Sequence, residues 1–215
     1  MSEHPSIANI RKSYQKQHLN EDEVASNPIT QFEKWWNEAT ASNIDEVNAM
    51  TLATCTPQGM PSARIVLLKG IHDDGFVFFT NYTSRKAEEI LSNPHVALVF
   101  FWKELERQVR IEGTVEKVND EESNTYFNSR PLESRIGAWA SHQSKVIPSR
   151  KFLEDKQHAI EKEFEGRDIP RPPFWGGFVV HPEKMEFWQG RPGRLHDRIL
   201  FFKDENTWKT ERLAP

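Results

Sequence analysis

The alternation of apolar runs with turn signals between residues 49 and 118 restricts the fold more than any other feature of the chain. AMTLATCT, SARIVLLKG and FVFFTN are separated by PQGM and DDG, HVALVFFW predicts a buried strand, and RQVRIEGTVEKV alternates apolar with polar residues. Short runs joined by turns are typical of antiparallel hairpins. The pattern returns near the C-terminus in FVVHPEKMEFWQG, RLHDRILFFKD and TWKTERL. We therefore expect a mainly β protein of the α+β class, an antiparallel barrel with helices around it.

Helices are expected in three places rather than after every strand, which argues against a parallel α/β sheet. In NPITQFEKWWNEATA, Asn27 is a plausible cap and Pro28 takes the first helical position. TSRKAEEILSNP has a cap in Thr83 or Ser84. A third helical stretch, broken at Pro131, covers roughly 119–165. No Gly-rich dinucleotide fingerprint follows any of the expected strands.

Size and composition point to one domain of an ordinary globular protein. Within the 215 residues we expect a mobile arm at 1–28 and a single domain at 29–215, with inserted helices at about 119–165. The formal net charge of −4 argues against a general nucleic-acid binder. Cys55 is the single cysteine, which argues against a disulfide framework. No apolar run has the length of a signal peptide or membrane helix, so we expect a cytoplasmic protein with no membrane partner.

Basic residues nevertheless gather in short clusters, of which RPGRLHDR is the densest. If residues 194–198 are extended, Arg194, His196 and Arg198 share one face of the strand. Such a face suits an anion. Any single cluster, taken alone, is more readily explained as a solvated surface.

Two further clusters lie where an anion can bind. Arg64 and Lys69 stand at the ends of the apolar strand RIVLLK, from which long cationic side chains can reach a phosphate. A core strand with solvated ends is the simpler explanation of this segment alone. Arg85 and Lys86 fall in the first turn of a helix, where cations are disfavoured unless an anion is also bound. The alternative is that both side chains point into water.

A third candidate combines a phenol, a guanidinium and a hydroxyl. Tyr126, Arg130 and Ser134 are each four residues apart, so they share an approximate helix face that suits a phosphate. Solvated polar groups at a helix end are an equally good explanation.

A flat ligand is suggested by a different set of side chains. Gln108, Gln143, Ser144 and Trp188 can bind the edge and face of a heterocycle, although each alone is more readily structural. No residues stand at metal-ligand spacing and no nucleophile and base are paired, so we expect neither a metal nor a hydrolase. A phosphorylated cofactor with a phosphorylated substrate would account for the surplus of basic clusters.

Together these motifs resemble the pyridoxine/pyridoxamine 5′-phosphate oxidase family. EFWQGRPGRLHDR is similar to the family signature, and RIVLLK, FFTNYTSRKA, ERQVRIEG, YFNSRPLESRIGAWASHQS and FWGGF occur in the family's order between RKSY and the final RLAP. The resemblance implies a split β-barrel and a homodimer with FMN at the subunit interface. It implies oxidation of pyridoxamine 5′-phosphate or pyridoxine 5′-phosphate by O₂ to pyridoxal 5′-phosphate, with release of H₂O₂ and, from the amine, NH₃. This reaction belongs to vitamin B6 cofactor biosynthesis and salvage.

The resemblance also implies roles for individual residues. The cofactor positions are matched by Arg64, Ile65, Val66, Leu67, Leu68, Lys69, Phe79, Thr80, Arg85, Lys86, Gln108, Gln143, Ser144, Trp188 and Arg198. The substrate positions are matched by Arg11, Lys12, Ser13, Tyr14, Lys69, Tyr126, Arg130, Ser134, Arg194, Leu195 and His196. Of these, Arg194 and His196 match the catalytic residues beside the substrate ring, and Arg11 to Tyr14 match a segment that closes over the site. Phe79 departs from the Tyr of many relatives, so a phenol contact is lost.

Under this interpretation a hydride passes from substrate C4′ to flavin N5. Arg194 would cover the substrate ring, and His196 would orient its substituents rather than act as an obligate base. Two alternatives remain, which are a non-catalytic carrier of FMN or pyridoxal phosphate and a different FMN split-barrel reductase. Reduction of bound flavin by the substrate distinguishes the oxidase from both.

Overall fold

The computed structural model describes residues 12–72, 75–205 and 207–215. They form two compact units: unit 1 contains the described residues up to 47 with 99–111 and 183–215, and unit 2 contains those of 48–98 and 112–182. The unit boundaries fall inside the three long strands, so each of these strands belongs to both units. The three are β5 (His95–Trp102), β6 (Arg107–Lys117) and β7 (Trp175–Gln189).

The described residues form one nine-stranded sheet with the order β2-β1-β5-β6-β7-β4-β3, to which β8 is added through β7 and β9 through β8. The other strands are β1 (Ala49–Cys55), β2 (Pro61–Leu67), β3 (Gly70–His72), β4 (Gly75–Asn81), β8 (Asp197–Asp204) and β9 (Thr207–Arg212). The pairs β1–β2, β3–β4, β4–β7, β7–β8 and β8–β9 are all antiparallel. The expected antiparallel α+β fold is therefore confirmed.

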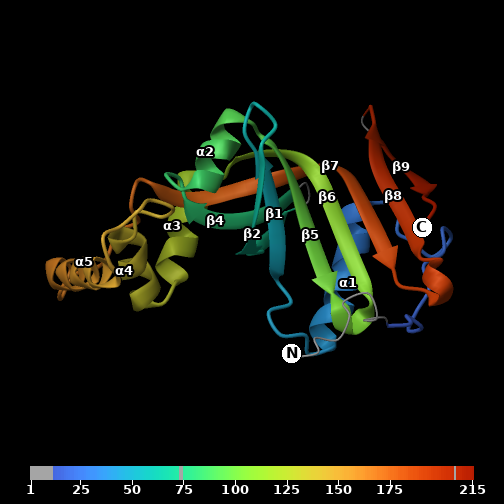
Figure 1. Ribbon diagram of the computed structural model, residues 1–215, viewed down its shortest axis with the longest axis horizontal. Helices are drawn as coiled ribbons and strands as arrows, with labels where there is room; N and C mark the ends of the chain where they lie inside the picture. The colour runs from blue at the N-terminus through green and yellow to red at the C-terminus, as the bar shows by residue number, and fades with distance from the viewer. Residues whose placement is uncertain (1–11, 73–74, 206) are drawn as a thin grey trace, which may run out of the picture. The chain divides into compact units, whose positions relative to one another are not determined.

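The helices of unit 2 are α2 (Arg85–Ser92), α3 (Asp120–Ser129), α4 (Leu132–Ala140) and α5 (Arg150–Glu163). Ser84 caps α2 by accepting a hydrogen bond from the backbone N–H of Ala87, as Ser/Thr caps do. The helical stretch expected at 119–165 consists of three helices, of which α4 and α5 lie side by side (Figure 1). A hydrophobic cluster joins α3 and α4 to the first residue of β7; its buried members are Phe127, Ile136, Ile169 and Trp175.

Unit 1 is organised around α1 (Pro28–Ala41). The backbone N–H of Ile29 donates to Oδ1 of Asn27 at 2.8 Å, so the cap and the first helical position are confirmed. Phe32 lies 5.0 Å from Phe100 between ring centroids, and Trp35 lies 5.2 Å from Phe187. Burying an aromatic side chain of this size contributes about 1.5–3 kcal/mol, so this packing fastens the helix to the strands of its own unit.

Two strand predictions need correction. The continuous apolar run in β5 predicted burial on both faces, but only alternate residues are buried and Phe101 is 53% exposed. An apolar run cannot by itself tell whether one face or both faces of a strand are covered. The run 62–70 is not one strand, because β2 ends at Leu67 and β3 begins at Gly70. Arg64 therefore lies in the middle of β2, and Lys69 lies beyond its end.

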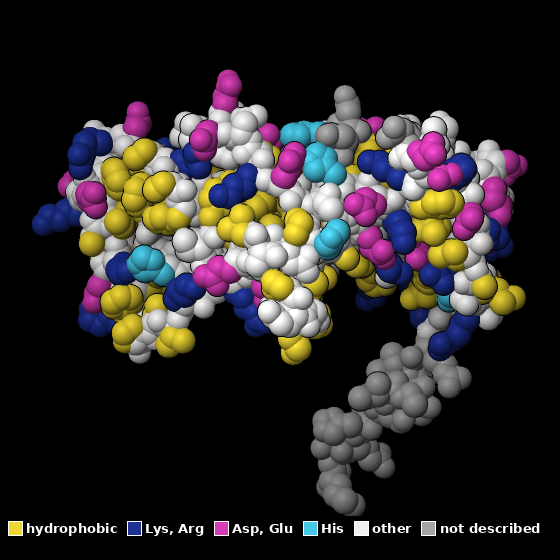
Figure 2. Space-filling model, turned by 90° about the horizontal axis from the view of Figure 1, so that it is seen from above, with side chains coloured by type: hydrophobic (Ala, Val, Ile, Leu, Met, Phe, Trp, Pro, Cys, Tyr) yellow, Lys and Arg dark blue, Asp and Glu magenta, His cyan; other side chains and the backbone are white. Residues whose placement is uncertain are grey.

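The face of the molecule drawn in Figure 2 carries mixed charge. Lys and Arg side chains alternate with Asp and Glu side chains over the face seen in Figure 2, without a large area of one sign. Within the described part of the chain, no helix is long and apolar enough to cross a membrane.

Candidate functional site

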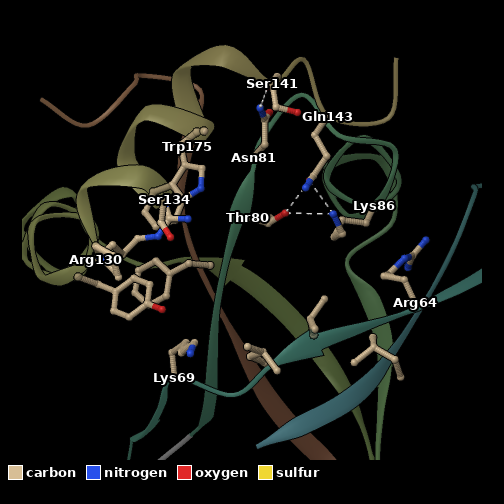
Figure 3. A pocket seen from close by; sticks show the side chains of 18 residues that line it. Arg64, Lys69, Thr80, Asn81, Lys86, Arg130, Ser134, Ser141, Gln143 and Trp175 are labelled. Atoms are coloured by element: carbon tan, nitrogen blue, oxygen red, sulfur yellow. Dashed lines mark hydrogen bonds between the residues drawn. The ribbon is translucent and has the colours of Figure 1, made fainter. Parts of the chain in front are cut away.

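A pocket of about 680 Å³ opens in unit 2, within the size range of ligand sites. Four cationic side chains line it, those of Arg64, Lys69, Lys86 and Arg130, and the eighteen lining residues include no Asp or Glu (Figure 3). The other lining residues are Ile65, Val66, Leu67, Phe79, Thr80, Asn81, Tyr126, Pro131, Ser134, Gly137, Ala138, Ser141, Gln143 and Trp175. A concave site with four cations and no acid favours anionic ligands.

Arg64 reaches the pocket from β2 and is held by groups outside it. Nη1 donates to Oγ1 of Thr54 at 2.6 Å, and Nη2 lies 3.4 Å from Oε2 of Glu89. Burial raises the pKa of Glu89, but hydrogen bonds from Ser62, Thr54 and Arg85 outweigh this effect and lower it to about 2. Glu89 is thus a permanent anion behind Arg64 and orients the guanidinium.

Among the residues that the structure describes, Lys86 has only neutral hydrogen-bond partners. It stands in the first turn of α2, as expected, and Nζ donates to Oε1 of Gln143 at 2.8 Å, to Oγ1 of Thr80 at 3.1 Å and to Oγ of Ser84 at 3.3 Å. Burial, helped by the positive charge of Arg64, lowers the pKa of Lys86 to about 8. An anion bound beside Lys86 and Arg64 would relieve this unfavourable arrangement.

A second group of side chains comes from the junction of α3 and α4. The chain breaks helical geometry at Arg130, which has φ −74° and ψ 148°, and α4 restarts at Leu132. Tyr126, Arg130 and Ser134 therefore do not share one helix face, yet all three line the pocket. Figure 3 shows Arg130 and Ser134 on the opposite side of Thr80 from Lys86 and Arg64.

Arg130 has spare hydrogen-bonding capacity. Its Nη1 atom is buried and has no hydrogen-bond partner. Burial lowers the pKa of this guanidinium, against a smaller raising effect of Tyr126. A buried donor without a partner is unfavourable, so this atom is suited to a ligand oxygen.

An aromatic stack supports the same group of residues. The ring of Phe79 lies 4.0 Å from that of Tyr126 at 20° and 5.6 Å from that of Trp175 at 12°. Nζ of Lys69 lies 6.0 Å from the centre of the Tyr126 ring. Gly177 makes room for the stack, because a Cβ there would come within 2.7 Å of the Phe79 ring.

Unit 1 contains a separate aromatic cluster. The ring of His196 lies 4.6 Å from that of Trp188, and Tyr14 lies 5.7 Å from Trp188 and 5.9 Å from His196. Nδ1 of His196 accepts a hydrogen bond from the backbone N–H of Arg191 at 3.1 Å. Burial and the nearby Arg194 lower the pKa of His196. The imidazole is therefore neutral at neutral pH and carries its proton on Nε2.

The shared face expected for Arg194, His196 and Arg198 is wrong. Arg194 ends a short 3₁₀ turn (η3, Pro192–Arg194) with φ +64°, and β8 begins only at Asp197, so residues 194–198 are not one extended strand. Arg198 is paired with buried Glu186 through Nε–Oε1 at 2.8 Å and Nη2–Oε2 at 3.0 Å.

The expected site residues fall into groups. Those that line the pocket are Arg64, Ile65, Val66, Leu67, Lys69, Phe79, Thr80, Lys86, Tyr126, Arg130, Ser134 and Gln143. Leu68, Arg85 and Ser144 belong to unit 2 but do not line it; Lys12, Ser13, Tyr14, Gln108, Trp188, Arg194, Leu195, His196 and Arg198 belong to unit 1. Arg11 lies outside the described residues. The lining residues that sequence reasoning missed are Asn81, Pro131, Gly137, Ala138, Ser141 and Trp175. Trp175 lies in the FWGGF motif, and this motif was the feature of the sequence that could have pointed to it as a site residue.

The fold and the pocket together define an antiparallel α+β protein with a site for anionic ligands. Residues 37–163 match the family described as Pyridoxamine 5′-phosphate oxidase, and residues 175–215 match the Pyridoxine 5′-phosphate oxidase C-terminal dimerisation region. The chain belongs to the pyridoxine/pyridoxamine 5′-phosphate oxidase family.

Full-length relatives agree with this assignment. A pyridoxine/pyridoxamine 5′-phosphate oxidase from Gloeothece citriformis is 56% identical over 98% of this chain and 99% of its own length, and one from Rubrobacter xylanophilus is 53% identical over 97% and 96%. Family membership supports oxidoreductase chemistry with FMN as the cofactor.

Solved structures share the fold. PhzG from Burkholderia lata 383, in complex with tetrahydrophenazine-1-carboxylic acid, is 31% identical and has a TM-score of 0.89, covering 95% of this chain and 100% of its own. A pyridoxamine 5′-phosphate oxidase-related, FMN-binding protein from Nostoc punctiforme is 17% identical with a TM-score of 0.68, covering 89% of this chain and 100% of its own. The fold is thus the split barrel that the sequence resemblance implied.

Proposed function

We propose that this protein is an FMN-dependent oxidase that converts pyridoxamine 5′-phosphate or pyridoxine 5′-phosphate into pyridoxal 5′-phosphate. O₂ accepts the electrons and yields H₂O₂, and the amine substrate also releases NH₃. The observation that carries the proposal is the pocket of unit 2, where four cations converge without an acid. Two phosphate esters, one on the cofactor and one on the substrate, account for this surplus of positive charge.

The residues near Lys86 fit the phosphate of FMN. Lys86 and Arg64 are two cations close enough for Arg64 to depress the pKa of Lys86, and no acid lies among the lining residues. Their chemistry suits a dianion. Beside them, Thr80 and Gln143 would contribute neutral hydrogen bonds, and residues 65–67 of β2, followed by Leu68, would flank the ring system. When bound, FMN supplies a two-electron acceptor that takes a hydride from the substrate and is reoxidised by O₂.

The second group would hold the substrate phosphate. Arg130 would donate through its unpartnered Nη1, Lys69 would add a second positive charge, and Tyr126 and Ser134 would donate through their hydroxyls. Binding energy gained at the phosphate is remote from the carbon that reacts, so it can hold the substrate in a reactive pose.

The catalytic residues that we propose, Arg194 and His196, come from unit 1. Arg194 would cover the substrate ring, and neutral His196 would donate from Nε2 to a polar substituent of the ring. The lowered pKa of His196 and the hydrogen bond that it accepts at Nδ1 support an orienting role rather than an obligate base. Lys12, Ser13 and Tyr14 would close over the same substrate.

We also propose a homodimer with FMN at the subunit interface. Trp188, Arg194, His196 and Arg198 all lie within residues 175–215, the stretch that matches the family's dimerisation region. Gln108, Trp188 and Arg198 would contact the cofactor in that assembly. For Arg198 this requires the guanidinium to act while paired with Glu186.

An anaerobic titration tests the proposed function. The purified protein should be yellow, and its flavin absorbance should bleach with pyridoxine 5′-phosphate or pyridoxamine 5′-phosphate. Admission of air should restore the colour and produce H₂O₂, and unphosphorylated pyridoxine should bleach the flavin far less at equal concentration. A yellow protein that neither ester reduces would be a carrier or a reductase for another substrate, and the proposal would fail.

A further inference from the structure

Arg130 is held in the pocket by aromatic rings rather than by an acid. Its guanidinium carbon lies 4.7 Å from the centre of the Trp175 ring and 5.8 Å from that of Phe127. Nη1 has no hydrogen-bond partner, and no ion pair joins Arg130 to a carboxylate within the described ranges. Arg64 and Arg198, by contrast, each have a buried glutamate partner. The charge of Arg130 is thus left for a ligand.

Trp175 is itself firmly placed. The indole is 6% exposed at the first position of β7. It stacks on Phe79 at 12°, and Phe127 meets it at 68° with 5.2 Å between centroids. The backbone N–H of Trp175 donates to the carbonyl of Pro172 at 3.1 Å, and its carbonyl accepts from Nη1 of Arg171 at 2.6 Å. A ring fixed on several sides can define the position of a long, flexible arginine.

The same indole also lies parallel to the phenol of Tyr126. The two rings are 6.1 Å apart between centroids and 8° from parallel. Two of the four groups assigned to the substrate phosphate, the guanidinium of Arg130 and the phenol of Tyr126, therefore adjoin one side chain. Displacing that side chain would displace both.

We propose that Trp175 is the positioning residue that sets Arg130 and Tyr126 for the phosphate of the substrate. An indole face attracts a guanidinium without neutralising its charge. A carboxylate in the same place would repel the phosphate dianion and compete for the donors of Arg130. This inference rests on the proposed function, in which the second group of pocket residues binds a phosphate ester.

The test uses the FMN-loaded protein and a probe that cannot react. The probe is 4-deoxypyridoxine 5′-phosphate, which lacks the oxidisable substituent at C4′, and its dissociation constant is measured by calorimetry. Trp175→Leu should weaken binding about tenfold, and Trp175→Phe, which keeps a ring, by less than about threefold. With pyridoxine 5′-phosphate, KM should rise by the same factor while kcat stays within about twofold, because the reacting carbon is remote from the phosphate.

A double-mutant cycle separates positioning from general damage. In an Arg130→Ala background, Trp175→Leu should weaken binding of the probe by less than about threefold, because the charged one of the two groups that it positions is gone and only Tyr126 remains. Trp139→Leu is the matched control. Trp139 packs in the same hydrophobic cluster, but it does not line the pocket, and its indole N–H donates to the carbonyl of Pro170. This control should lower the melting temperature and leave the affinity for the probe unchanged.

Equal weakening by Trp175→Leu with and without Arg130 would overturn the inference, as would equal weakening by Trp139→Leu. If the leucine variant does not fold, Trp175→Phe carries the same cycle, and its small loss of affinity should become smaller still when Arg130 is alanine. Failure of the wild-type protein to bind the probe would instead count against the proposed function. The two failures are therefore distinguishable.

Discussion

Nζ of Lys86 lies 2.8 Å from Oε1 of Gln143, and within the described part of the chain this ammonium group donates to neutral acceptors alone. Partial burial beside Arg64 holds its pKa at about 8, well below that of an exposed lysine. A structure that keeps a cation under these conditions is arranged to receive an anion.

The affinity for FMN should therefore fall as the pH rises above about 8. In the free protein Lys86 loses its proton near that pH, whereas a bound phosphate would raise the pKa and retain the proton. Binding then takes up a proton, so the dissociation constant should increase by up to about tenfold per pH unit above 8 and be nearly constant between pH 7 and 8. Quenching of flavin fluorescence between pH 7 and 10 measures it. Lys86→Gln should bind FMN more weakly and should lose this rise of the dissociation constant above pH 8. If the rise persisted in the variant, a group other than Lys86 would be its cause.

Removing the positive charge of Lys69 or of Arg130, the two cations proposed to bind the substrate phosphate, should chiefly raise KM. Arg130→Ala or Lys69→Ala deletes a charged hydrogen bond worth about 1.5–3 kcal/mol, so KM for pyridoxine 5′-phosphate should rise about tenfold or more. Steady-state rates measure this change, with Arg150→Ala on exposed α5 as the control that leaves KM near the wild-type value. If KM were unchanged in both Arg130→Ala and Lys69→Ala, the assignment of these residues to the substrate phosphate would be refuted.

Arg194→Ala should lower kcat/KM without weakening FMN binding. The side chain is exposed on the η3 turn of unit 1, and it is proposed to cover the substrate ring rather than to hold the cofactor. Flavin titration and steady-state kinetics on one preparation separate the two effects. Full activity in this variant would remove Arg194 from the catalytic residues.

Gly177→Ala should destabilise unit 2 and weaken substrate binding together. The added Cβ would lie 2.7 Å from the Phe79 ring and 2.6 Å from Cγ2 of Val118, so the aromatic stack beside Arg130 must move. Overpacking of this kind costs about 1–3 kcal/mol. Thermal unfolding measures the loss, and Phe79→Leu, which provides space, should restore part of it. An alanine variant as stable as the wild type would show that the stack is not tightly packed.

Much of the fold follows from local patterns in the sequence. The Asn27 cap with Pro28 and the alternation along β6 were predicted and are confirmed, and of the two caps expected for α2, Thr83 or Ser84, the structure uses Ser84. Each depends on residues within one turn of helix or one strand, where capping and periodicity act. The antiparallel pairing of strands joined by a turn, such as β1–β2 and β8–β9, follows for the same reason, whereas the division of residues 62–70 between β2 and β3 and the pairing of β4 with β7 do not.

The tertiary structure decided which charged groups are available to bind a ligand. Local spacing placed Arg194, His196 and Arg198 on one face, but the η3 turn, with Gly193 and Arg194 both at φ +64°, removes Arg194 from the strand. Arg198 is neutralised by Glu186, a residue that only the pairing of β7 with β8 brings near. The spacing of residues along one strand does not show which residue of a neighbouring strand will pair with them.

The composition of the pocket shows the same division. The sequence by itself determined that cations stand in the first turn of α2 and at the ends of the RIVLLK run, and that a phenol, a guanidinium and a hydroxyl are spaced four residues apart. Only the tertiary structure brought Trp175, far along the chain at the start of β7, beneath Arg130 and Tyr126. Helix and strand preferences act over a few residues, whereas the contact of an indole with a guanidinium depends on how distant segments pack, and that is decided by the whole core at once.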